Sequence, residues 1–415
     1  MNARQRLQAA FRHEEPDRVP IDLGSSTSSG ISALAHDALR RQLGVCEGRT
    51  RVYEVVQQVA LPEEEILDRF GVDVISIGRA YDTEDAAWSD FVLPGGVPVQ
   101  FPSWFRPEPG KDGSLIARAG DGTAIGAMPS GATFFDQTLF PYVDGYPEDY
   151  GRLGEAQALV TWGAFPASPW THAAEPDFWQ GLRARTLALR LSTGRALVAA
   201  GPGKLFEWGI FLRRMDNFLM DIAQAPAEVE RFCDALLERQ LPVLEKLGQA
   251  VGDLVDVIRL GDDLGMDSGP LLSPRAYRRI FKPRHKLICD TIKKYTDAPI
   301  CLHSCGSIYA LLPDLIEAGF QAFNPVQITS RNMEPWRLKQ DFGKDTVFWG
   351  SGCDTRHILN HASPAEVKDH VQANLEVMAP GGGFVFSAVH NILPDVPPEN
   401  IIAMFEAVEE FSGRA

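Results

Sequence analysis

The sequence has few cysteines, no long apolar run and no excess of positive charge. Six cysteines in 415 residues are too few for a disulfide scaffold, so the thiols are more interesting as reactive or metal-binding groups. No stretch approaches about 18 uninterrupted apolar residues, and we therefore expect no membrane span. The net charge of −15 would repel phosphate backbones, which argues against a nucleic-acid-binding protein.

The first residues also lack the features of a secretory signal. MNARQRLQAAFRHEEPDRVP has neither a long apolar centre nor a small-residue cleavage site, and the expected location is the cytoplasm. Apolar residues make up 45% of the chain and charged residues 23%, which is ordinary for a folded globular protein.

Short β-branched or apolar runs recur along the chain, and most lead into a polar or Gly-rich turn and then a helical pattern. Strands that alternate with helices predict a parallel sheet, and eight of them predict a closed (β/α)8 barrel of the TIM type. A doubly wound open sheet is the alternative, but no strand is followed by G-x-G-x-x-G. The eight runs are 19–23, 72–77, 196–200, 254–260, 299–303, 322–326, 346–350 and 383–387.

This rhythm is interrupted between residues 80 and 186. The segment has Gly/Pro clusters and five of the eight tryptophans: Trp88, Trp104, Trp162, Trp170 and Trp179. We interpret it as an insertion, with a small β-ribbon, in a single barrel domain that spans 1–415. Its aromatic residues either anchor the insertion to the barrel or line an apolar pocket under a lid over the barrel mouth.

The loops that follow the strands of a β/α barrel converge on one mouth, where catalytic residues sit. His303 and Cys305 stand at the end of one strand run. Their spacing of two residues places both side chains on the same face, and imidazole with thiolate is a donor pair that zinc prefers. The alternative is a buried histidine, hydrogen-bonded to backbone, beside an inert thiol.

His390 follows the last strand run, in a loop stiffened by Pro394, Pro397 and Pro398. A histidine in a rigid loop suits a metal ligand or a general acid, although it could also cap a helix or pack at the edge of the core. Cys353 follows the seventh run and is a weaker candidate for a metal ligand.

Polar residues follow several other strand runs. Asp262 and Asp263 could act as a general acid, bind ligand hydroxyls or orient a metal-ligating histidine, whereas N-capping of the next helix would explain one of them. Glu207, Asn324 and Asn391 are candidates for substrate binding at the same mouth.

With these residues in place, the chain resembles the uroporphyrinogen decarboxylase superfamily, and within it the zinc-dependent, corrinoid-linked methyltransferases. The resemblance covers most of the chain outside the insertion. It is carried by Pro16–Pro20, Gly261–Gly265, Leu272–Tyr277, His303–Gly306, Trp349–Asp354 and His390–Ile401.

The resemblance implies a β/α barrel and a zinc site of a His-x-Cys pair with a later cysteine. His303 and Cys305 match the pair, His390 occupies the later position, and Cys353 is a reserve ligand. The implied reaction moves a methyl group between a small molecule and a corrinoid, and the aromatic insertion favours a methoxylated aromatic. Because the corrinoid-binding motif Asp-x-His-x-x-Gly is absent, the corrinoid should belong to a separate partner protein.

Two alternatives remain open at this stage. The first is a metal-free decarboxylase of the same fold, with His390 and an aspartate as proton donors. The decarboxylase branch carries an arginine-rich segment after the first strand, whereas residues 24–30 here read GSSTSSG and offer no guanidinium for substrate carboxylates. The second is a non-catalytic barrel that binds a corrinoid or another small molecule.

Overall fold

A computed structural model describes residues 1–45, 48–93, 95–164 and 167–413 of the chain. Within them, seven strands form a parallel sheet in the order β4-β11-β12-β15-β16-β17-β18. Parallel bridges from Ile21 to Phe386 and from Asp22 to Val74 join the two edges of this sheet, so residues 21–22 supply the eighth strand and close the barrel. All eight predicted strand runs therefore form barrel strands, and the prediction of a (β/α)8 barrel is confirmed.

The barrel strands after the bridge at 21–22 are short: β4 (Val74–Ser76), β11 (Ala196–Ala200), β12 (Val257–Gly261), β15 (Ile300–His303), β16 (Ala322–Asn324), β17 (Val347–Trp349) and β18 (Phe384–Val385). Their side chains alternate between the barrel interior and the surrounding helices. Val74, Val257 and Val347 pack inside the barrel, whereas Ile75, Ile258 and Phe348 belong to the larger core between sheet and helices.

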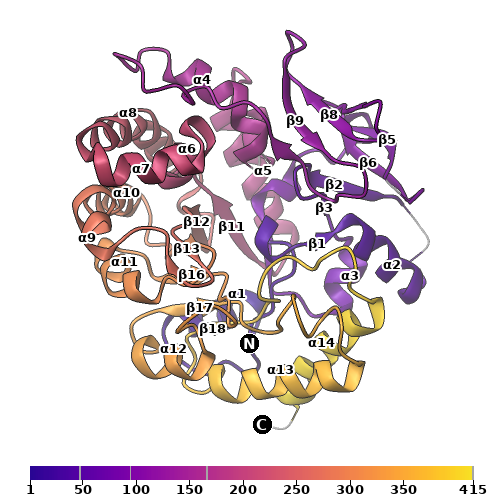
Figure 1. Cartoon of the computed structure of the whole chain (residues 1–415). Coiled ribbons are helices and arrows are strands. Elements are labelled where there is room, and N and C mark those ends of the chain that lie inside the picture. Colours follow the sequence, from indigo (N-terminus) through magenta and orange to yellow (C-terminus); the bar gives the residue numbers. More distant parts are fainter. Residues whose placement is uncertain (46–47, 94, 165–166, 414–415) are drawn as a thin grey trace.

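Helices surround this barrel (Figure 1). They are α3 (Glu64–Arg69), α5 (Phe178–Ser192), α6 (Phe206–Arg213), α7 (Met215–Gln224), α8 (Pro226–Val251), α9 (Pro274–Ala276), α10 (Lys282–Lys293), α11 (Leu312–Ala318), α12 (Pro335–Phe342), α13 (Pro364–Met378) and α14 (Pro398–Ser412). None of the helices in the described part combines the length and apolar character needed to cross a membrane.

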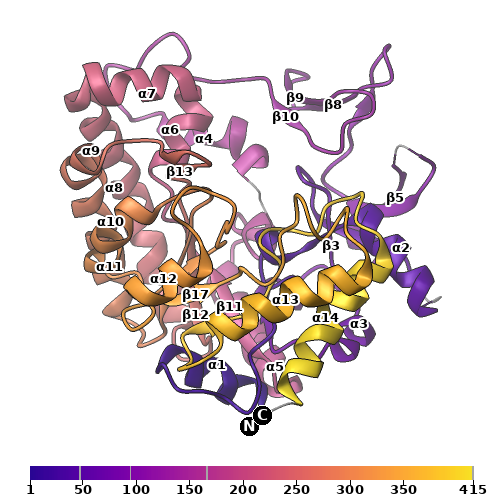
Figure 2. The ribbon, with the colours of Figure 1, turned by 60° about the horizontal axis from the view of Figure 1, so that its bottom comes forward.

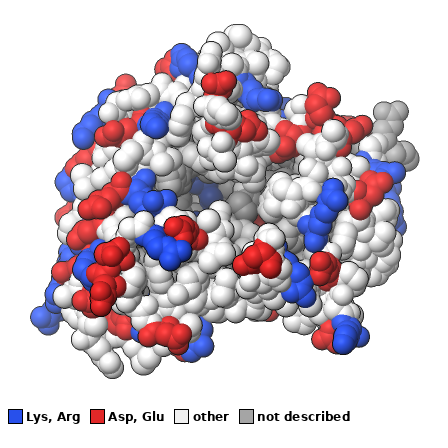
Figure 3. Space-filling model, turned by 90° about the horizontal axis from the view of Figure 1, so that it is seen from above, with Lys and Arg blue, Asp and Glu red and all other residues white. Residues whose placement is uncertain are grey.

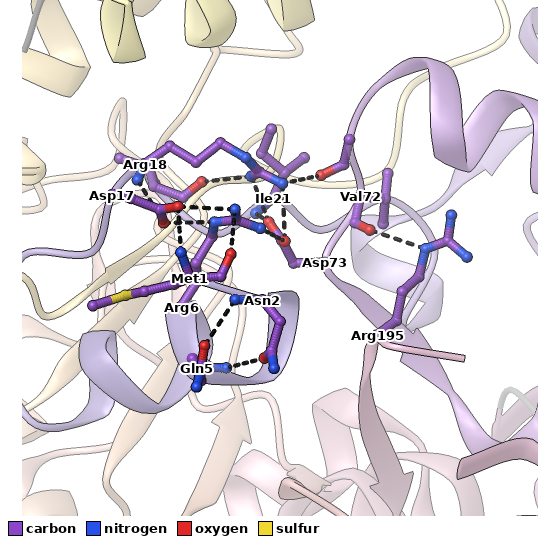
Figure 4. A network of polar contacts seen from close by, with 12 residues as sticks. Met1, Asn2, Gln5, Arg6, Asp17, Arg18, Ile21, Val72, Asp73 and Arg195 are labelled. Atoms are coloured by element: carbon purple, nitrogen blue, oxygen red, sulfur yellow. Dashed lines mark hydrogen bonds and ion pairs between the residues drawn. The ribbon is translucent and has the colours of Figure 1, made fainter. Parts of the chain in front are cut away.

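Helix α1 (Ala3–Phe11) closes the amino end of the barrel, where its Leu7 and Ala10 pack against the interior side chains. Figure 2 shows α1 at the lower side of the molecule, below β11 and β12. A buried ion cluster fixes the segment after α1: Asp73 accepts hydrogen bonds from Arg18 at 2.6 and 2.9 Å and from Arg6 at 3.1 Å (Figure 4). The carboxyl ends of the strands, at the opposite side, form the mouth.

Besides the short pair β13 (Gly265–Met266) and β14 (Gly269–Pro270), the described residues form two larger antiparallel or mixed sheets outside the barrel. One combines β1 (Ile31–Ser32), β2 (Thr50–Glu54) and β3 (Val59–Ala60) with β5 (Trp88–Val92) and β6 (Pro98–Pro102). The other contains β7 (Glu108–Pro109), β8 (Leu115–Arg118), β9 (Ala124–Met128) and β10 (Asp136–Gln137). The first sheet thus recruits residues 31–60, between α2 (Ala33–Leu43) and α3, as well as the predicted insertion.

The predicted end of the insertion, at residue 186, falls inside α5, which packs beside α8 and leads directly into β11. Helix α4 (Leu153–Val160) precedes it. Aromatic residues of the insertion anchor it to the rest of the chain. The rings of Phe105 and Phe135 pack edge-to-face, as do those of Phe135 and Trp162. Tyr142, Tyr146 and Tyr150 all contact Phe232 of α8. The anchoring alternative accounts for these side chains.

Candidate metal centre

His303 is the last residue of β15, and its side chain points into the barrel mouth. The neighbouring strands pair Gly261 with His303 and His303 with Asn324, so these three positions form one interior layer. Cys305 follows in the loop, and its Sγ lies 3.5 Å from His303 Nε2. The predicted His-x-Cys pair therefore presents both donors to the same space.

His390 comes to this pair from the loop after β18. One ligand atom from each of His303, Cys305 and His390 can be chosen so that all three lie within 4.8 Å of one another. In the part of the chain described, these residues form the one group of three or more His, Cys, Asp or Glu side chains that close. The ring centroids of the two histidines are 5.9 Å apart. Side chains separated by more than eighty residues thus meet at one point, as the sequence predicts.

In each of the two histidines, Nδ1 contacts the side-chain amide oxygen of one asparagine. Asn324 Oδ1 lies 2.9 Å from His303 Nδ1, and the Oδ1 of Asn391 is hydrogen-bonded to His390 Nδ1. An amide oxygen can only accept, so both contacts favour the tautomer with hydrogen on Nδ1 and a free lone pair on Nε2. This is how a neighbouring group prepares a histidine to bind a metal.

The electrostatics of the site match uncharged histidines and a protonated thiol when no cation is present. Burial, with the positive charge of Arg259, lowers the pKa of His303 well below its usual range. Burial also lowers the pKa of His390. The pKa of the Cys305 thiol is raised well above its usual range by burial and by the nearby Asp263 carboxylate. A bound dication would reverse this last effect, because metal coordination deprotonates a thiol.

The donors present fit a zinc ion. Two imidazoles and one thiol form a three-ligand set of the type found in catalytic zinc sites, which leave a fourth position for water or substrate. Both histidines are already neutral and oriented, so His303, Cys305 and His390 would hold the ion.

Asp262 and Asp263, predicted as catalytic or orienting residues, have different surroundings. Asp262 is completely buried, and its carboxylate accepts the backbone N–H groups of Phe206 and Glu207 at 3.0 and 2.8 Å. His285 Nε2 lies 3.1 Å from the same group. Asp262 thus caps the start of α6, which precedes it in the sequence, and not the helix that follows it, which the sequence pattern had suggested.

Asp263, by contrast, reaches the donors. Its Oδ1 accepts the backbone N–H of Cys305 at 2.8 Å and lies 3.5 Å from His303 Nε2. One third of its side chain is exposed at the mouth (33%), so a ligand in the mouth can contact it.

Glu207, predicted to line the pocket, lies in the first turn of α6 and is almost fully buried. Both of its carboxylate oxygens accept hydrogen bonds from Lys204 Nζ at 2.5 Å. Burial raises the pKa of Glu207 to about 7, although Lys204 opposes this shift. Its proximity to the metal donors is shown at Gly261, where an added Cβ would lie 3.6 Å from Glu207 Oε2 and 3.9 Å from the Cβ of His303.

Cys353 does not join the group. Its thiol is fully buried among core side chains, with the carbonyl oxygen of Asp354 3.9 Å from Sγ. The three-residue donor group does not include it. The reserve ligand of the sequence prediction therefore lies outside the group of His303, Cys305 and His390.

Two polar residues of the mouth were not identified from the sequence. Arg259 of β12 donates from Nη2 to Ser28 Oγ at 3.0 Å, and Ser28 Oγ donates to Asn324 Oδ1 at 2.6 Å. Strand alternation could have located Arg259, because Val257, Arg259 and Gly261 share the interior face while Ile258 and Leu260 face outward. Ser28 lies in the serine-rich loop 24–30, where no such alternation applies.

Parts of the chain are similar to proteins of known family. Residues 209–411 match the family model of uroporphyrinogen decarboxylase (URO-D). A methylcobamide:CoM methyltransferase, MtaA, from Methanosarcina barkeri is 27% identical over 168 residues, 38% of this chain and 42% of that protein. A uroporphyrinogen decarboxylase from Pseudoalteromonas translucida is 41% identical over 185 residues, 41% of this chain and 48% of that protein. The chain therefore spans less than half the length of these curated relatives.

Among solved structures, a methyltransferase from Methanosarcina mazei superposes over 99% of both chains with a TM-score of 0.58 and 16% identity. At this identity the likeness concerns the fold, and it extends to the parts of the chain outside residues 209–411.

Proposed function

We propose that this protein is a zinc-dependent methyltransferase, because residues 209–411 match the family model of uroporphyrinogen decarboxylase and the chain is similar to a methyltransferase. It moves a methyl group between a small substrate, such as a methoxylated aromatic compound, and a corrinoid held by a separate partner protein. The observation that carries the proposal is the convergence of His303, Cys305 and His390 within 4.8 Å.

The chain's own residues prepare the site for this chemistry. His303, Cys305 and His390 would hold zinc, which when bound supplies Lewis acidity to the oxygen or sulfur of the substrate. Asn324 and Asn391 orient the two imidazoles. Asp263 stands at the mouth beside the thiol, where it can accept a hydrogen bond from a hydroxyl of the ligand.

We infer that Glu207 supplies the proton for the leaving group. Glu207 has a pKa of about 7 and lies beside the His303 strand. A carboxyl group with such a pKa can hold and release a proton near neutral pH. We assign the proton to Glu207, which lies beside the His303 strand, rather than to Asp262, whose contacts are with the start of α6 and with His285.

The test combines metal analysis with a spectral assay. Purified protein is expected to hold about one zinc per chain, and with Co(I) cobalamin and a methoxylated aromatic it should form methyl-Co(III). Cys305→Ala should lose zinc and at least about 100-fold in rate, since it removes one of three ligands. Cys353→Ala, outside the donor group, should keep both properties.

The second candidate function is decarboxylation, because the chain is also similar to the uroporphyrinogen decarboxylase from Pseudoalteromonas translucida. It predicts a chain without bound zinc, with carboxy-lyase activity that survives His303→Ala. Zinc bound at one ion per chain and lost in Cys305→Ala would exclude it, whereas decarboxylation by zinc-free protein would exclude the methyltransferase.

A further inference from the structure

Arg259 has no counter-ion within 4.0 Å among the described residues, in contrast to arginines near the amino end of the barrel. Its Nε is buried without a hydrogen-bond partner, and Nη2 has only the neutral Ser28 hydroxyl. Within the described residues, no carboxylate oxygen lies within 4.0 Å of its guanidinium nitrogens. By comparison, Arg6 and Arg18 share the buried Asp73 carboxylate. A charge that is partly removed from water without a charged partner is costly, so the guanidinium of Arg259 points to a missing anion.

The surroundings of Arg259 would suit an oxyanion. An interior hollow of about 10 Å³ is lined by Arg259, Ser25, Ser26 and Asn324, together with Val198, Val257, Cys301 and Trp349. This volume accommodates about one water molecule and therefore one oxygen of a ligand. The Arg259 guanidinium supplies N–H donors, and a guanidinium matches the geometry of carboxylates and sulfonates.

The hollow is close to the metal donors. Hydrogen bonds of 3.0, 2.6 and 2.9 Å lead in sequence from Arg259 Nη2 to Ser28, Asn324 and His303 Nδ1. Seen from above, the face of the molecule is hollowed at its centre, and basic side-chain atoms are visible in its depth (Figure 3). A small ligand can therefore reach the metal donors with one end and Arg259 with the other.

We propose that Arg259 is a specificity-determining residue that binds one oxyanion, a carboxylate or a sulfonate, on the small substrate. The proposal rests on the proposed function for the identity of the site and adds the chemical class of its ligand. A zinc dication beside Arg259 would bring further positive charge to the mouth, and an anionic ligand supplies the compensating charge. Neutral methylated compounds would be weaker ligands.

The experiment measures binding rather than turnover. Zinc-loaded protein is titrated calorimetrically, without corrinoid, with 4-methoxybenzoate and with its neutral analogue 4-methoxybenzamide. Acetate and methanesulfonate, as competitors, distinguish carboxylate from sulfonate recognition. Wild-type protein should bind the acid at least about tenfold more tightly than the amide, because the amide leaves the partly buried guanidinium without a counter-ion.

Two variants and one control isolate the guanidinium. Arg259→Met should weaken binding of the acid at least about tenfold and leave acid and amide within about twofold of each other, and Arg259→Lys should lie between. Arg183→Met, which removes an outer-layer arginine paired with Asp253, should bind like wild type. Zinc content is measured for every variant and should stay near one per chain.

The outcomes separate the two proposals. Wild-type protein that binds no acid or does not prefer acids over amides, or an Arg259→Met variant that keeps the preference, would overturn the oxyanion site. Acid binding that depends on Arg259, in a chain that transfers no methyl group, would support the oxyanion site and contradict the methyltransferase. Methyl transfer without any preference for charge would do the reverse.

Discussion

At the scale of single residues, the site depends on side chains that orient the metal donors. Asn324 Oδ1 accepts from both His303 and Ser28, and its Nδ2 donates to the carbonyl of Trp349 at 3.1 Å. Its amide is thus held by three protein groups. This makes Asn324 a positioning residue for His303 in our proposal, in place of the substrate contact expected from the sequence.

Asn324→Ala should therefore weaken zinc binding by about 10–100-fold, the usual effect of losing the partner of a ligating histidine. Chelator competition measures this affinity directly. Asn324→Asp keeps an acceptor for His303 Nδ1 and should bind zinc at least tenfold more tightly than the alanine variant. Asn217→Ala, on α7 with its amide on Val143, is the matched control. Equal zinc affinity in Asn324→Ala and wild type would refute the positioning role.

The residues of the site differ in how far the sequence could reveal them. His303 and Cys305 were predictable because a strand alternates its side chains and the strand run ends at His303. The same rule applies to Arg259, but this residue lies inside a strand, whereas the predicted site residues were chosen at strand ends. Cys353 follows Gly350 and Ser351, whose φ angles are 127° and 62°. A chain that leaves the extended conformation there no longer obeys strand alternation, so the direction of Cys353 was not predictable.

At the scale of elements, the barrel strands were predictable and the outer sheets were not. The barrel runs are apolar on both faces, as expected for parallel strands covered by helices. Strands β1 and β3 have only two residues each, which is too short for a period to show. Strand β2 pairs with β6 through Thr50 and Val99, a contact between distant segments that no local pattern encodes.

One buried acid in these outer strands makes stability depend on pH. Glu54 ends β2, is fully buried, and accepts the backbone N–H groups of Val56 and Gln57 at 2.6 and 2.9 Å. Burial raises its pKa from 4.5 to about 7. Between these values the folded chain holds a proton that the unfolded chain has released, so Glu54 lowers stability as pH rises from about 4.5 to 7, with no further change above.

Glu54→Gln removes this titration. We expect the stability difference, the free energy of unfolding of Glu54→Gln minus that of wild type, to be larger at pH 8 than at pH 5 by about 1–3 kcal/mol. Urea denaturation at the two pH values measures the difference. Glu108→Gln, an exposed acid of β7 paired with Arg118, should show a change below about 0.5 kcal/mol. A Glu54→Gln curve parallel to wild type across this range would contradict the assignment.

At the scale of the whole molecule, the metal centre connects two segments that are separated by more than eighty residues in the sequence. His303 and Cys305 belong to the β15 end, whereas His390 belongs to the loop after β18, next to the first barrel strand through the pairing of Phe386 with Ile21. An ion held by all three donors would therefore link two sides of the mouth. Because the unfolded chain does not hold these donors together, the ion should favour the folded state.

Zinc removal should accordingly lower the thermal stability of the entire barrel. At free zinc 100 times the dissociation constant, binding contributes about 2.7 kcal/mol, and the apo protein should melt roughly 2–6 °C below the zinc-loaded protein. Differential scanning calorimetry with chelator and then with added zinc measures this difference. Cys353→Ala should show the same shift, since its thiol lies outside the donor group, whereas Cys305→Ala should show almost none. If Cys305→Ala responded to zinc as strongly as wild type, the stabilising ion would be bound elsewhere and the assignment of His303, Cys305 and His390 would fail.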